Sequence, residues 1–107
     1  MSNYLTVAAD RQARMFKALG NPHRLALFLR LAADCRRPPR GPALKAYVGD
    51  LAETLDLAPS TVSHHLKELR EAGLIRTERD GQNVCCWVDP AVPDALADLF
   101  HNLCKTC

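Results

Sequence analysis

Three residues near the C-terminal end of the chain, His101, Cys104 and Cys107, follow one another at steps of three. On a helix such steps keep the side chains within about 120° of arc, so all three could converge on one ion. Thiolates bind soft metals and metalloids, and two neighbouring thiols can also form a reversible disulfide. The two cysteines also continue an apolar stripe through Phe100 and Leu103, so small apolar residues at a helix seam are the alternative interpretation.

The chain has five cysteines, and nothing in it suggests export. An odd number argues against a disulfide scaffold and leaves metal binding, redox chemistry or burial. Cys85 and Cys86 are adjacent in a β-prone run, where neighbouring side chains point to opposite faces and cannot easily hold one ion. We expect Cys86 in the core, and Cys35 is a candidate third thiolate. Cys104 and Cys107 are the preferred metal ligands, and the weaker candidates are Cys35, Cys85, Cys86 and His101.

A different chemistry is expected of residues 59–73, where Val62, Leu66 and Leu69 recur at helical spacing and predict a packing face. His65 falls on this face and is expected to be buried. The opposite face carries hydroxyl and imidazole groups instead of Glu/Lys pairs, which favours contact with DNA bases and phosphates over simple packing. The residues assigned to DNA contact, in this helix and in the segment that follows it, are Ser60, Thr61, Ser63, His64, Lys67, Arg79 and Gln82.

Two amphipathic helices are predicted before this stretch. Apolar residues recur at helical spacing across residues 5–19 and stop at a glycine. The pair Asn21-Pro22 then suits a helix cap and a first turn. The second helix includes Leu25 and Leu29 in its apolar stripe and is expected to be deeply buried. Three prolines and a glycine in residues 35–42 predict a loop after it.

A capping box from Asp50 to Glu53 predicts a short third helix, joined by a tight turn to residues 59–73. Two short helices joined in this way form a helix-turn-helix. Strand-like alternation on both sides of Asp80-Gly81 predicts a hairpin, which in this position is a wing. A last amphipathic helix is expected from about Leu96, with an apolar stripe that needs a partner. The predicted fold is mainly α with a small β-hairpin (α+β), a winged helix-turn-helix of about five helices plus a two-stranded wing.

The composition of 107 residues, with 48% hydrophobic and 24% charged residues, fits one soluble domain spanning residues 1–107, with a modest core that dimerisation would help. The chain has no apolar run near 18 residues and no signal peptide, so we expect a cytoplasmic protein with no membrane partner. Residues 1–45 hold nine basic and two acidic residues, and residues 46–107 hold five and ten. The basic half could face phosphates, although solvated helix faces explain the same asymmetry. A Gly-rich phosphate loop and a catalytic triad are not found, so an enzyme is not expected.

The run FKALGNPHRL at residues 16–25 and the helix-turn-helix and wing at residues 50–81 resemble the ArsR/SmtB family of winged-helix repressors. The resemblance covers about residues 13–100. It implies a homodimer, paired through N- and C-terminal helices, that represses a promoter until an inducer binds. A dimer would place two recognition helices in successive major grooves, so the operator is expected to be an inverted repeat in double-stranded DNA. The inducers of such proteins are usually metal or metalloid ions, and sometimes thiol-modifying species.

Two metal sites known in this family are not expected here. The thiolate site on the first helix of the helix-turn-helix is replaced by Tyr-Val-Gly-Asp at residues 47–50, and Ala91 and Pro93 occupy ligand positions of the zinc site on the last helix. The remaining ligands are rich in thiols and poor in carboxylates, which favours trivalent arsenic or antimony as the inducer. The alternatives are zinc or cadmium with His101 as a ligand, a redox or persulfide sensor with a reversible disulfide, and a constitutive winged-helix binder.

Overall fold

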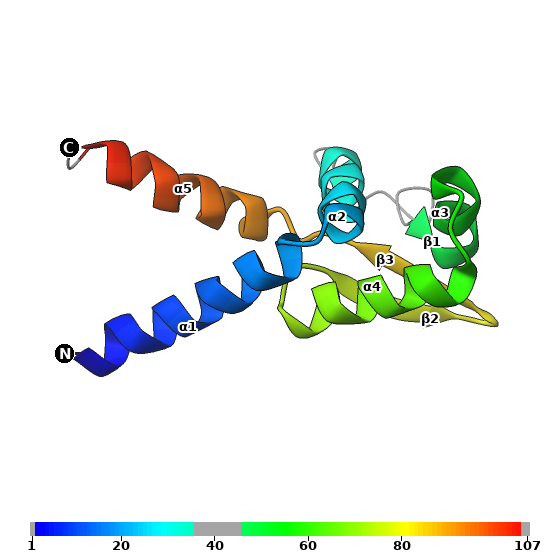
Figure 1. Ribbon diagram of the computed structural model, residues 1–107, viewed down its shortest axis with the longest axis horizontal. Helices are drawn as coiled ribbons and strands as arrows, with labels where there is room; N and C mark the ends of the chain where they lie inside the picture. The colour runs from blue at the N-terminus through cyan, green and yellow to red at the C-terminus, as the bar shows by residue number, and fades with distance from the viewer. Residues whose placement is uncertain (1, 36–45, 106–107) are drawn as a thin grey trace.

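The computed structural model describes residues 2–35 and 46–105. Within them the chain forms five helices around a helix-turn-helix, as predicted, and three strands (Figure 1). None of the helices in this part of the chain is both long and apolar enough to span a membrane. The elements are α1 (Ser2–Leu19), α2 (Pro22–Cys35), β1 (Ala46–Tyr47), α3 (Val48–Leu55), α4 (Pro59–Glu71), β2 (Arg76–Asp80), β3 (Asn83–Trp87) and α5 (Ala91–Lys105).

The wing hairpin belongs to a three-stranded antiparallel sheet of order β1-β3-β2, not to the two-stranded sheet that the sequence predicted. The added strand pairs Ala46 with Cys86 and Tyr47 with Cys85. Two residues are too few to show an alternating pattern, and their partners lie about 40 positions away. This strand therefore leaves no local signal in the sequence.

The turn of the hairpin lies one residue later than predicted. Asp80 pairs with Asn83, so the two-residue loop is Gly81-Gln82 and not Asp80-Gly81. Gly81 has a φ of 64°, as expected of glycine at the first central position of a type II′ turn, whose twist matches that of the two strands. Gln82 therefore lies at the tip of the wing.

The core lies where α2, α3 and α4 pack against one another and α2 and α3 lie against β3. Leu27, Phe28 and Leu31 are the buried residues of α2, whereas Leu25 and Leu29 are exposed, so the prediction that these two leucines are buried was wrong. Because α2 is apolar on most sides, its pattern does not decide which side turns inward. The buried hydrophobic residues are Ala18, Leu27, Phe28, Leu31, Leu51, Ala52, Val62, Leu66, Leu69, Leu74, Ile75, Cys85, Cys86 and Val88.

The start of α2 was predicted correctly, and the start of α3 was not. The side-chain oxygen Oδ1 of Asn21 accepts the backbone N–H groups of His23 and Arg24, at 2.9 Å and 3.2 Å. Asp50 does not cap α3, because the helix begins at Val48 and Asp50 lies within its first turn. The pairing of β1 with β3 fixes the chain up to Tyr47, so the helix starts directly from the strand. The loop predicted for residues 35–42 lies outside the described residues beyond residue 35.

The last helix begins at Ala91, earlier than the expected start near Leu96. Asp89 caps it, since its Oδ1 accepts the N–H of Ala91 at 3.0 Å, and Pro93 is tolerated in the first turn. The carboxylate of Asp89 also lies 3.3 Å from the guanidinium of Arg76. These contacts connect the start of α5 to the first residue of β2.

Helices α1 and α5 project from the core toward the same end of the molecule, opposite the tip of the wing (Figure 1). The rings of Phe16 and Phe100 make an edge-on contact between them, with 5.8 Å between centroids. Both rings are nevertheless exposed in the protomer, Phe100 to 53%. The two outer helices therefore present apolar surface that the protomer itself does not cover.

Candidate nucleic-acid interface

Helix α4 has one packed face and one exposed face, as its sequence predicted. Its buried residues are Val62, His65, Leu66 and Leu69. The exposed face is polar and faces solvent along its length. The residues assigned to DNA contact are all exposed: Ser60, Thr61, Ser63, His64, Lys67, Arg79 and Gln82.

The N-terminal end of α4 suits an external hydrogen-bond acceptor. Pro59 lies in the first turn, and the backbone oxygen of Ala58 accepts the N–H groups of Thr61 and Val62, at 3.0 Å and 3.1 Å. No side chain from Ala58 caps this end. The partial positive charge of the helix N-terminus is thus left for an acceptor from outside, such as a DNA phosphate.

The turn that joins α3 to α4 fixes the angle of the helix-turn-helix. Asp56 adopts a left-handed conformation with a φ of 53°, which aspartate tolerates better than most residues. The N–H of Leu57 donates to the oxygen of Ala52 at 3.0 Å, and the N–H of Asp56 donates to that of Glu53 at 3.3 Å. These bonds satisfy the last carbonyls of α3 and turn the chain toward α4.

The C-terminal end of α4 is closed by a Schellman motif. The N–H of Gly73 donates to the oxygen of Arg70 at 2.9 Å, and the N–H of Leu74 to that of Leu69 at 3.0 Å. Gly73 takes the left-handed conformation predicted for it, with a φ of 82°. The following Leu74 is buried, so this turn anchors the exit from α4 before the chain enters β2.

The wing places further polar groups near the start of α4. Arg79 lies near the end of β2 and Gln82 at the tip of the hairpin. The tip of the hairpin and the N-terminal end of α4 lie at the same end of the molecule (Figure 1). One side of the protomer can therefore present helix α4 and the wing to a single DNA duplex.

A cluster of imidazoles links α4 to α2. His65 is 9% exposed, and its ring stacks on that of His23, with 5.7 Å between centroids and 28° between planes. The ring of His64 lies 5.9 Å from that of His65. Burial, followed by the nearby charge of Arg24 and the two other imidazoles, lowers the pKa of His65 below its ordinary value of 6.5, while Glu68 acts in the opposite direction. The sequence predicted the burial of His65, but no pattern pointed to His23.

Two of the five cysteines lie in the sheet and are buried. The thiol of Cys85 donates to the backbone oxygen of Glu78 at 3.3 Å. Burial raises the pKa of the Cys86 thiol to about 12, with a further contribution from Cys85. Cys86 lies in the core, as predicted. Because metals and oxidants react with thiolates, burial disfavours both residues as ligands.

Three of the other candidate ligands lie on α2 and α5. Cys35 is the last residue of α2, Cys104 lies in the last turn of α5, and His101 is exposed on α5. The side chains of these two cysteines, and the whole of Cys107, lie outside what the structure describes. Among the described residues, no group of three His, Cys, Asp or Glu side chains is arranged to hold a metal ion.

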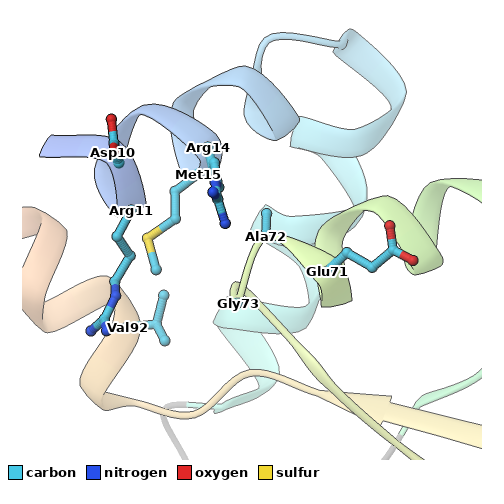
Figure 2. A pocket seen from close by; sticks show the side chains of 8 residues that line it. All are labelled: Asp10, Arg11, Arg14, Met15, Glu71, Ala72, Gly73 and Val92. Atoms are coloured by element: carbon cyan, nitrogen blue, oxygen red, sulfur yellow. The ribbon is translucent and has the colours of Figure 1, made fainter. Parts of the chain in front are cut away.

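A hollow of about 660 Å³ lies between α1, the end of α4 and the start of α5 (Figure 2). Met15 extends from α1 into it, and Arg11 and Val92 lie beside it, while Glu71 is directed away. A side-chain Cβ at Gly73 would lie 3.7 Å from the terminal methyl group of Met15. The outer helices therefore reach the segment at which α4 ends.

Comparison with known proteins gives a family match and close structural neighbours. A family model described as a helix-turn-helix domain matches residues 19–78. The HTH-type transcriptional regulator YgaV of Escherichia coli K12 is 31% identical over 99 residues, which cover 92% of this chain and 91% of YgaV.

Two solved structures share the fold over almost the whole chain. One is the solution structure of the homodimeric winged helix-turn-helix DNA-binding domain Mb0332 from Mycobacterium bovis, a possible ArsR-family regulator, with a TM-score of 0.69 and 26% identity over 95% of this chain and 88% of that one. The other is reduced HlyU from Vibrio cholerae N16961, with a TM-score of 0.67 and 26% identity over 94% and 95% of the chains.

A helix-turn-helix with an exposed polar second helix and a hairpin wing defines a winged-helix DNA-binding transcriptional regulator. The resemblance drawn from the runs at residues 16–25 and 50–81 is confirmed by the match to the helix-turn-helix domain together with the similarity to the possible ArsR-family regulator Mb0332. This chain belongs to the ArsR/SmtB family of winged helix-turn-helix transcriptional regulators. Its relatives are regulators of transcription and not enzymes.

Proposed function

We propose that the chain is a transcriptional repressor that binds an inverted-repeat operator as a homodimer and leaves it when an inducer reacts with cysteine thiolates. The observation that carries the DNA-binding part is the exposed polar face of α4, which lies at the same end of the molecule as the wing tip. Ser60, Thr61, Ser63 and His64 would contact base edges and nearby phosphates in the major groove, and Lys67 a phosphate. Arg79 and Gln82 would follow the adjacent backbone.

The homodimer is supported by the outer helices. Phe16 and Phe100 are exposed on helices that project away from the DNA-binding end, where a second copy can cover them. The similar domain Mb0332 is homodimeric. With α4 close to neutral in net charge, two copies acting together supply much of the affinity for DNA.

To test the DNA interface, a duplex is first selected from random-sequence DNA by its binding to the wild-type chain. The affinity of each variant for this duplex is then measured by fluorescence anisotropy. The double variant Ser63→Ala, His64→Ala should lose at least about tenfold in affinity, because hydrogen bonds to bases are removed. Lys67→Ala should reduce the slope of log K against log salt by about 0.9, the value of one phosphate contact. Arg30→Ala, which removes an exposed arginine of α2, is the control. Unchanged affinity in both test variants would contradict the proposed interface.

For the inducer, we propose trivalent arsenic or antimony held by Cys104 and Cys107 together with Cys35. The buried sheet cysteines are poor candidates, because the pKa of Cys86 is about 12 and Cys85 is buried beside it. A site of three thiolates would therefore use every remaining cysteine. Zinc or cadmium would instead accept His101 as a fourth ligand.

A reversible disulfide or persulfide is the second candidate for the inducing event. Such chemistry requires two reactive thiols and not three, so it is compatible with the burial of the sheet cysteines. One similar structure is of HlyU in its reduced form, and a relative with a reduced form supports a redox response in this chain. In this case an oxidant or persulfide donor, not an ion, would release the chain from DNA.

The two candidates are separated by treating the DNA-bound chain with arsenite, cadmium, diamide and a persulfide donor in parallel, and measuring release and the number of remaining thiols. If the chain senses an ion, its release from DNA should be accompanied by a thiolate-to-ion absorbance band, and all thiols should be free again once the ion is removed by a chelator. Redox sensing predicts release with the loss of two thiols, restored by dithiothreitol. Cys104→Ser should abolish release in either case, whereas Cys85→Ala should not. Release that survives both Cys104→Ser and Cys107→Ser would exclude a site on the last helix.

A further inference from the structure

Three of the four histidines of the chain meet where the start of α2 lies against α4. His65 is the central ring, stacked on His23 from α2 and next to His64 from its own helix. The outer two rings are exposed, and the central one is buried. The stack thus continues the exposed imidazole face of α4 onto a second helix.

The buried ring of His65 is not held in place by a hydrogen bond from its Nδ1 atom. Nδ1 of His65 is buried and has no hydrogen-bond partner among the described residues. A buried polar atom without a partner is unfavourable, so an apolar residue would pack here at lower cost if packing were the whole role of this position. What the imidazole ring offers beyond an aliphatic side chain is a flat face on which His23 stacks.

The position of His23 is fixed by its own helix as well. Its N–H and that of Arg24 donate to Asn21, so the first amides of α2 are occupied and any ligand contact there must come from the imidazole. The guanidinium of Arg24 is held by Nε donating to the oxygen of Ala18 at 2.7 Å. His23 is therefore the exposed, uncommitted donor at this edge of the α4 face.

The charges around the stack come from three helices. His23 and Arg24 of α2 and His64 and Glu68 of α4 act on His65. The charged residues that line the neighbouring groove are Arg14 and Lys17 of α1, Arg24 of α2, and Glu68 and Glu71 of α4. Burial, and after it the charges of Arg24, His23 and His64, lower the pKa of the central ring, while Glu68 acts in the opposite direction.

We propose that His23 is a further contact to the DNA backbone, and that His65 is the positioning residue that holds its ring beside α4. This inference rests on the proposed function, because it assumes that the exposed face of α4 lies on DNA. Its ligand is a phosphate of the duplex next to the one contacted from α4. Because an imidazole gains its charge between pH 8 and pH 6, the contact strengthens as the pH falls and DNA binding takes up protons.

The inference is tested with the full chain and the same selected duplex, by anisotropy titrations at pH 6.0 and pH 8.0 over a range of salt concentrations. His23→Ala should weaken binding about threefold to tenfold at pH 6.0 and less than about twofold at pH 8.0, and at pH 6.0 the salt slope should fall by about 0.9. Arg30→Ala, which removes an exposed cation from the same helix as His23, should change neither value. An equal loss at both pH values, or no loss at pH 6.0, would overturn the assignment of His23.

The role of His65 is tested by rescue. His65→Phe keeps a ring for His23 and should retain the pH dependence and the salt slope of the wild type, whereas His65→Ala should lose both to the extent that His23→Ala does. If circular dichroism shows that His65→Ala does not fold, the positioning role of His65 is tested by comparing His65→Phe with His23→Ala. A His65→Phe variant that folds but behaves as His23→Ala would refute positioning by stacking.

Lys67→Ala distinguishes a failure of the proposed function from a failure of this inference. If Lys67→Ala does not weaken DNA binding, the proposed DNA-binding face of α4 is contradicted. If Lys67→Ala weakens binding as expected and His23→Ala has no effect, only the inference about His23 is contradicted.

Discussion

His65 makes the stability of the fold depend on pH. Its pKa is lowered in the folded chain from 6.5, chiefly by burial, so below about pH 6.5 the unfolded chain binds a proton that the folded chain resists. Stability from this residue is complete above that range and is lost as the pH falls. We expect the free energy of unfolding in urea to drop between pH 7.5 and pH 5.5, and to drop less in His65→Phe, which carries no titrating ring. An equal drop in both proteins would show that other groups cause it.

The sheet cysteines are expected to be unreactive. At a pKa of about 12, the Cys86 thiol is almost entirely protonated at neutral pH, and burial also blocks access to Cys85. Iodoacetamide followed by peptide mapping should label both residues only as fast as the chain unfolds, and promptly in urea. Labelling of either one in the native chain at the rate of a small-molecule thiol would contradict this description of the sheet.

The end of helix α4 depends on a glycine, which can be tested against a second glycine. Gly73→Ala should destabilise the chain by about 1–2 kcal/mol, because its φ of 82° strains any L side chain, although a Cβ there would make only an ordinary van der Waals contact with Met15. Gly49→Ala in α3 meets no atom within 4 Å and should be neutral or stabilise by up to about 1 kcal/mol. Urea unfolding of both variants measures the difference. Equal effects would mean that the Schellman turn is not what fixes the exit from α4.

The elements with strong local chemistry were predictable from the sequence. The Asn21 cap, the left-handed Gly73 and the polar face of α4 each follow from short-range patterns, and each was found. Strand β1 was not predictable, because its pairing with β3 is a long-range contact of two residues. The sequence did not predict which side of α2 is buried, because this helix carries apolar residues on most of its sides. The elements that pack against α2 decide which of these residues are buried, and the period of the sequence does not.

The part of the candidate site that lies on α4 was predictable from the sequence, and the part that depends on contacts between helices was not. Exposed hydroxyls and imidazoles on α4 follow from helical periodicity, and so does the burial of His65. His23 carries no such signal, since it lies on another helix and meets His65 only through the packing of α2 on α4. Sequence periodicity assigns residues to the faces of one helix, whereas contacts between helices require the tertiary structure.

For the whole molecule, association through the outer helices should control DNA affinity. Phe100→Asp places a charge on the exposed apolar surface of α5 and should convert the dimer to a monomer in sedimentation velocity, with a loss of DNA affinity of more than about tenfold. Asn102→Asp adds the same charge at an exposed polar position of the same helix and should leave both unchanged. Tight DNA binding by a monomeric Phe100→Asp protein would remove dimerisation from the proposed function.

Strand β1 runs into α3 without an intervening residue, while its hydrogen bonds hold it to β3, the central strand of the sheet and one of the two strands of the wing. The wing and the first helix of the helix-turn-helix are therefore braced together, and bending the hairpin would require breaking this short strand pair. In the proposed dimer, each protomer would therefore meet DNA as one stiff unit. An inducer would then weaken binding by changing the distance between the two units, while each keeps its own shape.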